Sequence, residues 1–215
     1  RLRQAAEDGQ TAALITPDRT LTRQVTAALD RWAIIPDDSA GMPLHLSPPG
    51  RFLRHVGDLF RDRLTAELLL TLLKHPLTHS GSDRGPHLRL TRELELHLRR
   101  HGPPYPQPAD LMAWAEAQND PLALPWAQWI SDCITAKELT GDTGDGGWLW
   151  QNDAGQEAWK TVSNLHDHAE HGGRINAADY TSLFHAVLSA GEVRNPDTPH
   201  PDILIWGTLE ARVQG

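Results

Sequence analysis

Two apolar runs near the ends of the chain have the pattern of buried parallel strands. Residues 12–16 read Ala-Ala-Leu-Ile-Thr and lead into a polar turn and a helical pattern. Residues 202–207 read Asp-Ile-Leu-Ile-Trp-Gly and lead into a polar turn just before the sequence stops. Such runs are typical of parallel strands whose carboxyl ends face a ligand. We therefore predict that both runs share one sheet, that no helix follows the second, and that the chain is a piece of a larger protein.

The residues after the first run have the periodicity of an amphipathic helix. Asp18 can cap this helix at its start. One apolar stripe of the helix is expected to be buried, namely Leu21, Val25, Ala28, Leu29 and Trp32. Around this helix we expect residues 1–11 to be frayed, 33–35 to be extended, 36–41 to form a turn and 44–46 to form a weak strand.

The middle of the chain has a helical pattern that proline and glycine interrupt repeatedly. The segments expected to be helical are 51–63, 65–75, 87–101, 108–119, 122–139, 154–171 and 177–190. Residues 141–147 are expected to form a surface loop, because they lack the terminal glutamate of a calcium loop and the Lys-Ser or Lys-Thr pair of a phosphate loop. Together these elements predict a predominantly helical α/β fold.

Length and composition limit the class of protein. The chain has 215 residues, of which 39% are hydrophobic, so a folded globular protein is expected. No apolar stretch reaches the roughly 18 residues that span a membrane, and the polar first segment lacks a signal-peptide pattern. The single cysteine, Cys133, excludes an intrachain disulfide and a four-cysteine metal cluster. We expect a cytoplasmic protein.

Charge is distributed unevenly along the chain. The net charge is −8, but residues 1–102 carry 15 Lys and Arg against 12 Asp and Glu, whereas residues 103–215 carry 5 against 16. A polyanion is therefore expected to contact the first half, while the acidic half faces solvent or a partner. The most basic segment contains Arg84, Arg89, Arg92, Arg99 and Arg100, with His87, His97 and His101.

The same basic segment allows a second interpretation. Its apolar face is expected to consist of Leu88, Leu90, Leu94, Leu96 and Leu98. Glu93 and Glu95 lie among the arginines and partly neutralise them. A solvated helix face with internal ion pairs therefore stands as the alternative to phosphate contact.

Histidine and tryptophan are abundant, but neither forms a recognisable site. His168 and His171 share a helical face, whereas His166 points elsewhere and the zinc-protease pattern is absent, so a solvated helix end is expected. Packing between helices, with base stacking as the alternative, is expected of the tryptophans in the acidic half, which are Trp126, Trp129, Trp148, Trp150 and Trp159. No nucleophile or paired-carboxylate motif stands out, so we expect no catalytic, metal or cofactor site.

Four segments resemble one protein family. They are AALITPDRTLTRQV at 12–25, DDSAG at 37–41, LLKHPL at 72–77 and LIWGTLEARVQ at 204–214. Together they are similar to the AddB family, subunits of bacterial AddAB helicase–nucleases that repair double-strand breaks. The resemblance covers nearly the whole chain and is most specific at its two ends. It implies a partial RecA-like sheet of helicase domain 2A, with its first part at 12–63, an inserted 2B-like helical domain at 64–200 and a return at 201–215.

The resemblance also implies that ATP hydrolysis has been lost. Residues 12–33 resemble helicase motif IV, whose strand usually ends in an aromatic residue and an arginine, but Ile15 and Thr16 stand there. Residues 203–214 resemble motif V, where Glu210 and Val213-Gln214 replace the usual histidine and Lys-Gly pair. Without a phosphate-binding cation, the charge that develops in phosphoryl transfer is not stabilised. No enzymatic activity is expected of this chain.

The family implies a role in DNA end resection and recombination. An AddA-like motor subunit would use ATP, and a nuclease domain with magnesium and an iron–sulphur cluster would lie outside this chain, which itself holds no cofactor. DNA, as a single strand or a duplex end, would be the other partner. The DNA-binding candidates are Arg19, Arg23, Arg89, Arg92, Arg99, Arg100, Thr208 and Arg212. The alternative is a stand-alone helical protein-interaction module without a nucleic-acid role, and an active ATPase is disfavoured.

Overall fold

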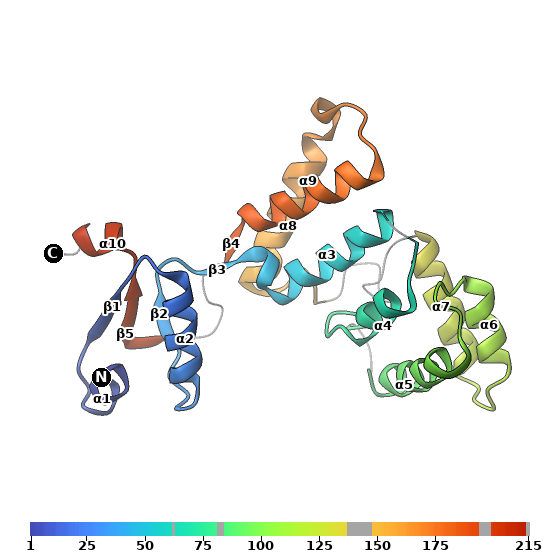
Figure 1. The fold of residues 1–215 in the computed structure, drawn as a ribbon, viewed down its shortest axis with the longest axis horizontal. Helices are drawn as coiled ribbons and strands as arrows, with labels where there is room; N and C mark the ends of the chain where they lie inside the picture. The colour runs from blue at the N-terminus through green and yellow to red at the C-terminus, as the bar shows by residue number, and fades with distance from the viewer. Residues whose placement is uncertain (62, 81–83, 137–147, 194–198, 214–215) are drawn as a thin grey trace. The chain divides into compact units, whose positions relative to one another are not determined.

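The computed structural model describes residues 1–61, 63–80, 84–136, 148–193 and 199–213. Within them the chain is mostly helical and contains a small parallel sheet, which confirms the predicted α/β class (Figure 1). The chain divides into two compact units. We call residues 1–43 with 192–215 the sheet unit, and residues 44–191 the helical unit. The loop expected over 141–147 lies outside the described residues.

Three parallel strands of the sheet unit bring the two chain ends together. β5 (His200–Trp206) lies between β1 (Ala12–Ile15) and β2 (Pro36–Asp38). Leu14 of β1 is level with Ile205 of β5 in the strand register. The prediction that both apolar runs share one sheet is therefore confirmed.

β2 forms where the sequence predicts a turn. Ala33 has a φ of 54°, and residues 33–35 form a turn and a connection rather than an extended piece. Pro36 occupies the first position of β2, where a missing N–H is tolerated. Pairing with β5 thus overrides the low strand propensity of proline and aspartate.

The N-terminal residues are helical and packed, not frayed. α1 (Leu2–Glu7) places Leu2, Ala5 and Ala6 against a buried cluster that contains Ile203 of β5. Burial of this small apolar face holds the first residues of the chain in place.

α2 (Arg19–Asp30) begins at its predicted cap and buries part of the predicted stripe. Thr22 and Leu29 are buried and Val25 is half-buried. The rest of the predicted stripe is exposed, namely Leu21, Ala28 and Trp32. The position of the sheet selects the buried side of the helix, and Thr22 is tolerated there because its hydroxyl donates to the Asp18 carbonyl at 3.3 Å.

Two further elements differ from expectation next to the unit boundary. The expected strand over 44–46 is a 3₁₀ helix, η1 (Leu44–Leu46). The Ser47 hydroxyl donates to the Leu44 carbonyl at 2.6 Å and accepts from the Gly50 N–H at 3.2 Å. This cap starts α3 (Pro48–Arg61) before the expected residue 51. A short antiparallel ladder of β3 (Met42–Pro43) and β4 (Glu192–Val193) closes the sheet unit.

The remaining helices lie where the sequence predicts them, with ends moved by a few residues. Thr65 and Asn176 cap two of them through side-chain oxygens. None of the helices in the described segments is long and apolar enough to cross a membrane. The helices of this part are α4 (Ala66–Lys74), α5 (Arg84–His101), α6 (Pro108–Glu116), α7 (Ala123–Ala136), α8 (Asn152–Asp167), η2 (Ala169–Gly172) and α9 (Ala177–Ala190).

The helical unit begins and ends earlier than the inserted domain expected over 64–200. α3, expected to belong with the sheet, packs against α9 instead. The Thr181 hydroxyl donates to the Gly57 carbonyl at 3.3 Å, and a Cβ at Gly57 would lie 3.0 Å from the Phe184 ring. This close packing places α3 in the helical unit.

A leucine- and tryptophan-rich core joins four helices of the helical unit. The helices α4, α5, α6 and α7 contribute Leu73, Leu94, Leu111 and Trp126, among others. On α5, Leu90, Leu94 and Leu98 are buried, whereas Leu88 and Leu96 of the expected apolar face are exposed. One stripe of α5 therefore carries the packing.

Candidate functional site

A pocket of about 270 Å³ opens at the carboxyl ends of the three parallel strands. Thr16 follows β1, Asp38 ends β2, and Gly207 and Thr208 follow β5. Ligands of open α/β sheets bind at this edge. It is therefore the first place to look for a function in the sheet unit.

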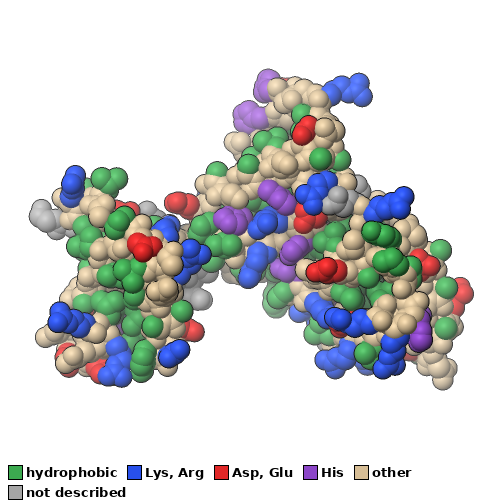
Figure 2. Space-filling model, viewed as in Figure 1, with side chains coloured by type: hydrophobic (Ala, Val, Ile, Leu, Met, Phe, Trp, Pro, Cys, Tyr) green, Lys and Arg blue, Asp and Glu red, His purple; other side chains and the backbone are tan. Residues whose placement is uncertain are grey.

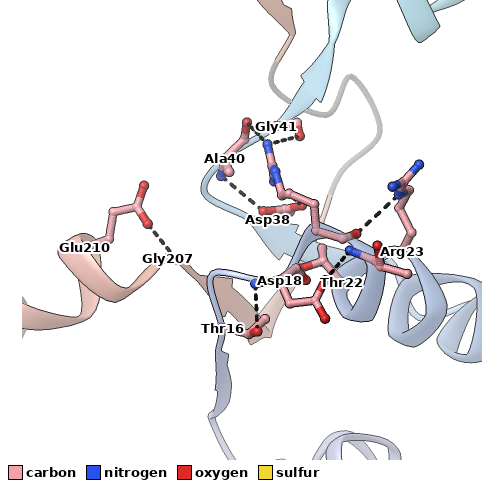
Figure 3. A network of polar contacts seen from close by, with 11 residues as sticks. Thr16, Asp18, Thr22, Arg23, Asp38, Ala40, Gly41, Gly207 and Glu210 are labelled. Atoms are coloured by element: carbon pink, nitrogen blue, oxygen red, sulfur yellow. Dashed lines mark hydrogen bonds and ion pairs between the residues drawn. The ribbon is translucent and has the colours of Figure 1, made fainter.

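The start of α2 is closed by the chain's own side chains (Figure 3). Asp18 Oδ1 accepts hydrogen bonds from the N–H groups of Thr20 and Leu21 at 2.8 and 3.3 Å. The Thr16 hydroxyl accepts from the Asp18 N–H at 3.0 Å. These N–H groups could otherwise bind a phosphate. A carboxylate already occupies that position.

The other two strand ends are closed in the same way. Glu210 Oε2 accepts from the Gly207 N–H at 2.6 Å, at the start of α10 (Thr208–Val213). α10 itself corrects the expectation that no helix follows β5. Asp38 Oδ1 accepts from the Ala40 N–H at 3.1 Å after β2. Each strand is thus followed by a turn in which an Asp or Glu carboxylate accepts at least one backbone N–H.

Arg19 closes the turn after β2. Its guanidinium donates to the Ala40 and Gly41 carbonyls at 3.1 and 3.5 Å and lies 3.5 Å from Asp38 Oδ2. Gly41 has a φ of 62°, a conformation that glycine adopts without strain. The guanidinium is therefore held by the turn and directed at internal acceptors.

The electrostatics of the pocket disfavour an anion. The charged side chains that line it are Arg19, Asp38 and Glu210, which together carry a net charge of −1 at neutral pH. The phosphates of a nucleoside triphosphate would meet two carboxylates and one guanidinium that is already paired. Among the lining residues, Arg19 is the cationic one, and its guanidinium is already bonded to two carbonyls and Asp38.

Arg19→Gln tests this structural role. The variant is expected to lower the free energy of unfolding by about 1 kcal/mol in urea titrations, because Arg19 is partly exposed and its bonds are only partly shielded. Arg23→Gln on the same helix is the matched control and should change stability by less. Unchanged stability of Arg19→Gln, combined with tenfold weaker single-stranded DNA binding, would instead make Arg19 a DNA ligand.

The structure brings only some of the DNA-binding candidates together. Arg19 and Thr208 line the pocket, and Arg23 and Arg212 are exposed on α2 and α10 of the same unit. The Arg23 side chain donates to the Arg19 carbonyl at 3.3 Å. The other four candidates lie on α5 in the helical unit, and they are Arg89, Arg92, Arg99 and Arg100.

On α5, two of these four arginines form ion pairs. Arg89 lies 2.5 Å from Asp120 and 3.1 Å from Glu93. Arg99 lies 2.8 Å from Glu95, whose pKa is lowered by hydrogen bonds from Lys74 and then from Arg99.

The other two α5 candidates face solvent. Within the described part of the chain, Arg92 and Arg100 are exposed and form no ion pair. Internal ion pairing thus applies to Arg89 and Arg99, whereas Arg92 and Arg100 keep their charges available to a partner.

Two members of the expected basic surface lie elsewhere. Arg84 donates to the His75 and Thr78 carbonyls at 2.9 and 3.2 Å and so closes the end of α4. His87 is 1% exposed, and its Nε2 lies 2.7 Å from the Leu73 carbonyl. The prediction that His87 lies on the surface is therefore wrong. Its buried ring lies between α4 and α7 and has hydrogen-bond partners on both, Leu73 and Trp126.

The histidine and tryptophan expectations have mixed outcomes. Among the described residues, no group of three or more His, Cys, Asp or Glu side chains could hold a metal ion.

The packing role expected of the tryptophans is confirmed for Trp126, whose ring lies 5.8 Å from that of the buried Trp114. Trp129 packs against the core of the helical unit, and the Trp159 ring lies 5.1 Å from that of Trp150. Trp148 and Trp159 are nevertheless more than half exposed.

The sequence contained signals for part of the pocket. Glu210 follows Gly207 by three residues, the spacing at which a glutamate reaches back to the start of a helix. Its capping role could have been predicted from that spacing. The contact between Arg19 and the turn after β2 has no comparable local signal, because it depends on the pairing of β2 with β5.

Neither a scan against models of known protein families nor a search of curated proteins finds a match for the chain. Its function is therefore inferred from its residues and their geometry.

Proposed function

We propose that this chain is a non-catalytic, helicase-like region of an AddB-type subunit, which guides DNA and packs against an AddA-like motor subunit during end resection. On this proposal the sheet unit is the remnant of a RecA-like domain 2A. The observation that carries the proposal is the pocket at the strand ends, where Asp18, Asp38 and Glu210 occupy the N–H groups that an active site would offer to phosphate.

The proposed loss of ATP hydrolysis has a direct electrostatic reason. Phosphoryl transfer needs cations or N–H donors directed at the transferred group. Here a carboxylate caps each strand end, and the guanidinium of Arg19 is used by carbonyls. On this proposal, the sheet edge that would hold a nucleotide is kept, but the groups that would act on the nucleotide have been lost.

The proposed cofactor assignment follows from the same division of roles. ATP would be used by the motor subunit, and the magnesium and iron–sulphur sites of the nuclease would lie in other parts of the complex. DNA would be held on this chain by exposed cations, of which Arg92 and Arg100 on α5 are the candidates without ion pairs among the described residues.

A direct test measures binding of a labelled oligothymidylate to the chain by fluorescence anisotropy. We expect the Kd to rise at least about tenfold between 50 and 200 mM salt, because binding releases counterions from several phosphates. The double variant Arg92→Gln/Arg100→Gln should weaken binding several-fold. The matched control, Lys160→Gln/Arg174→Gln, removes the same charge from the acidic half and should leave the Kd nearly unchanged.

The same preparation tests the absence of motor chemistry. Titration with Mg·ATP is expected to give no saturable binding and no phosphate release. Saturable ATP binding with hydrolysis would contradict the account of the pocket. Absence of DNA binding at low salt would contradict the proposed role in guiding DNA.

A stand-alone protein-interaction module is the second candidate, and one observation favours it. Trp159 on α8 and Trp148, shortly before that helix, are exposed, and both lie in the acidic half of the chain. Exposed aromatic side chains on an acidic surface fit a protein partner better than a nucleic acid. Failure of DNA binding at every salt concentration would favour this candidate.

A further inference from the structure

α3 carries a row of basic side chains that the proposed DNA contacts above do not include. Arg51, Arg54 and His55 are three and four residues apart, so they lie on one side of the helix. Asp58 continues the row by one turn. Figure 2, viewed as in Figure 1, shows blue Lys or Arg side chains and purple His side chains over the region of α3.

Two other helices of the same unit add histidines to this row. His185 of α9 places Nε2 3.6 Å from Asp58 Oδ1, and His55 places Nδ1 4.0 Å from Asp58 Oδ2. His75, at the end of α4, lies with its ring 5.0 Å from that of Phe52. We call Arg51, Arg54, His55, His75 and His185 the α3 patch.

The α3 patch has more cationic groups than its carboxylate can balance. His55 faces Asp58, Arg54 and Arg51 on its own helix and His185 from α9. His75 faces His55 and Arg51 from α3 and Arg84 from α5. Within these two sets of neighbours, Asp58 is the one carboxylate. An anion placed on the patch would relieve the repulsion among the cations.

The histidines respond to this surplus of positive charge. Burial, with smaller contributions from the neighbouring His55, Arg51 and Arg84, lowers the pKa of His75 to about 4. Burial also lowers the pKa of His55, with Arg54, Arg51 and His185 acting in the same direction against Asp58. Both rings are therefore neutral at pH 7 and able to gain a proton when an anion arrives.

We propose that the α3 patch binds the phosphates of single-stranded DNA. The assignment of DNA as the ligand rests on the proposed function, whereas the location rests on the α3 patch itself. Two guanidinium groups supply charge at every pH, and arginine pairs well with phosphate oxygens. The two neutral histidines, His55 and His75, add charge once the phosphate is bound.

This arrangement couples binding to pH. A bound phosphodiester stabilises the protonated form of each nearby histidine, so the complex takes up protons. Affinity therefore rises as the pH falls from 7.5 to 6.0. The phosphodiester keeps its charge over this range, so the protein supplies the pH dependence.

Anisotropy with labelled oligothymidylate on the full chain tests the proposal at fixed salt. Arg51→Gln/Arg54→Gln is expected to weaken binding at least about tenfold, by loss of two phosphate contacts. The charge-matched control is Lys160→Gln/Arg174→Gln, which should bind as the wild type does. Asp58→Asn is expected to strengthen binding several-fold, because it removes the carboxylate that competes with phosphate. A gain of affinity cannot result from misfolding.

A second pair of variants tests the histidines. His55→Gln/His75→Gln should flatten the increase in affinity between pH 7.5 and 6.0, whereas His168→Gln/His171→Gln, at another helix end of the same unit, should not. Equal pH dependence in both double variants would overturn the role of the α3 histidines.

The outcomes separate this proposal from the broader one. If the wild type binds DNA and the two α3 arginine substitutions leave the Kd unchanged, the α3 assignment fails and the proposed function stands. If the wild type binds no DNA, both fail. If polyglutamate competes as well as oligothymidylate of equal charge, the patch is a site for acidic proteins and the assignment to nucleic acid is overturned.

Discussion

Leu94→Ala should lower the free energy of unfolding of the helical unit by about 3 kcal/mol. Leu94 is 0% exposed and lies in the core that α4, α5, α6 and α7 share. Truncation removes the transfer free energy of three carbon atoms and leaves a cavity, and such changes cost about 2–5 kcal/mol. Because that is a large part of the stability of a small domain, thermal unfolding should also shift by several degrees.

Leu96→Ala provides a matched control for this measurement. Leu96 lies on the same helix two residues later and is 47% exposed. The chemical change and the helix propensities are identical, so the difference between the two variants isolates burial. Urea titrations followed by tryptophan fluorescence should give a loss of less than about 1 kcal/mol for Leu96→Ala. Equal losses would show that α5 does not bury the face described here.

Stability should fall as the pH drops from 7 to 4.5, with His87 as a main cause. His87 is buried and accepts a hydrogen bond from Trp126 Nε1 at 3.0 Å through Nδ1, while Nε2 faces the Leu73 carbonyl. Burial lowers its pKa to about 4 from an unfolded value of 6.5. The unfolded chain therefore binds the proton first, and stability rises with pH across this window.

The expected loss at pH 4.5 is about 2 kcal/mol from His87, with a smaller share from the half-buried His75. Urea midpoints at several pH values measure it. The lowered pKa values of Glu95 and Asp120 stabilise the fold above the unfolded values of 4.5 and 3.8, and this contribution is lost as the pH falls through and below those values, mainly under the window considered for His87. His87→Gln retains donor and acceptor groups but cannot titrate, so its stability should depend less on pH in this window. A slope equal to that of the wild type would contradict the assignment.

The elements predicted well from the sequence are those with strong local signals. Thr65 and Asn176 are caps at the expected starts of α4 and α9, and Gly191 follows the expected end of α9. Both apolar runs form strands. In β5, β-branched and aromatic side chains favour the strand. Local chemistry was sufficient at these positions.

The elements predicted poorly depend on distant partners. β2 consists of Pro36, Asp37 and Asp38, which favour turns, and only pairing with β5 makes it a strand. α2 could bury either of two faces, and the sheet selects the one with Thr22. The same limit applies to the pocket, because Asp18 as a cap was readable whereas the partner of Arg19 was not.

The central position of β5 determines when the sheet unit can form during synthesis. β1 and β2 each pair with β5 and not with one another, so neither has a strand partner until residue 200 has left the ribosome. Thr11 and Asp202, joined by a hydrogen bond, are 191 positions apart. By that stage all of the helical unit has been synthesised, and its contacts are more local. The sheet unit therefore closes last, after the helical unit has had time to fold.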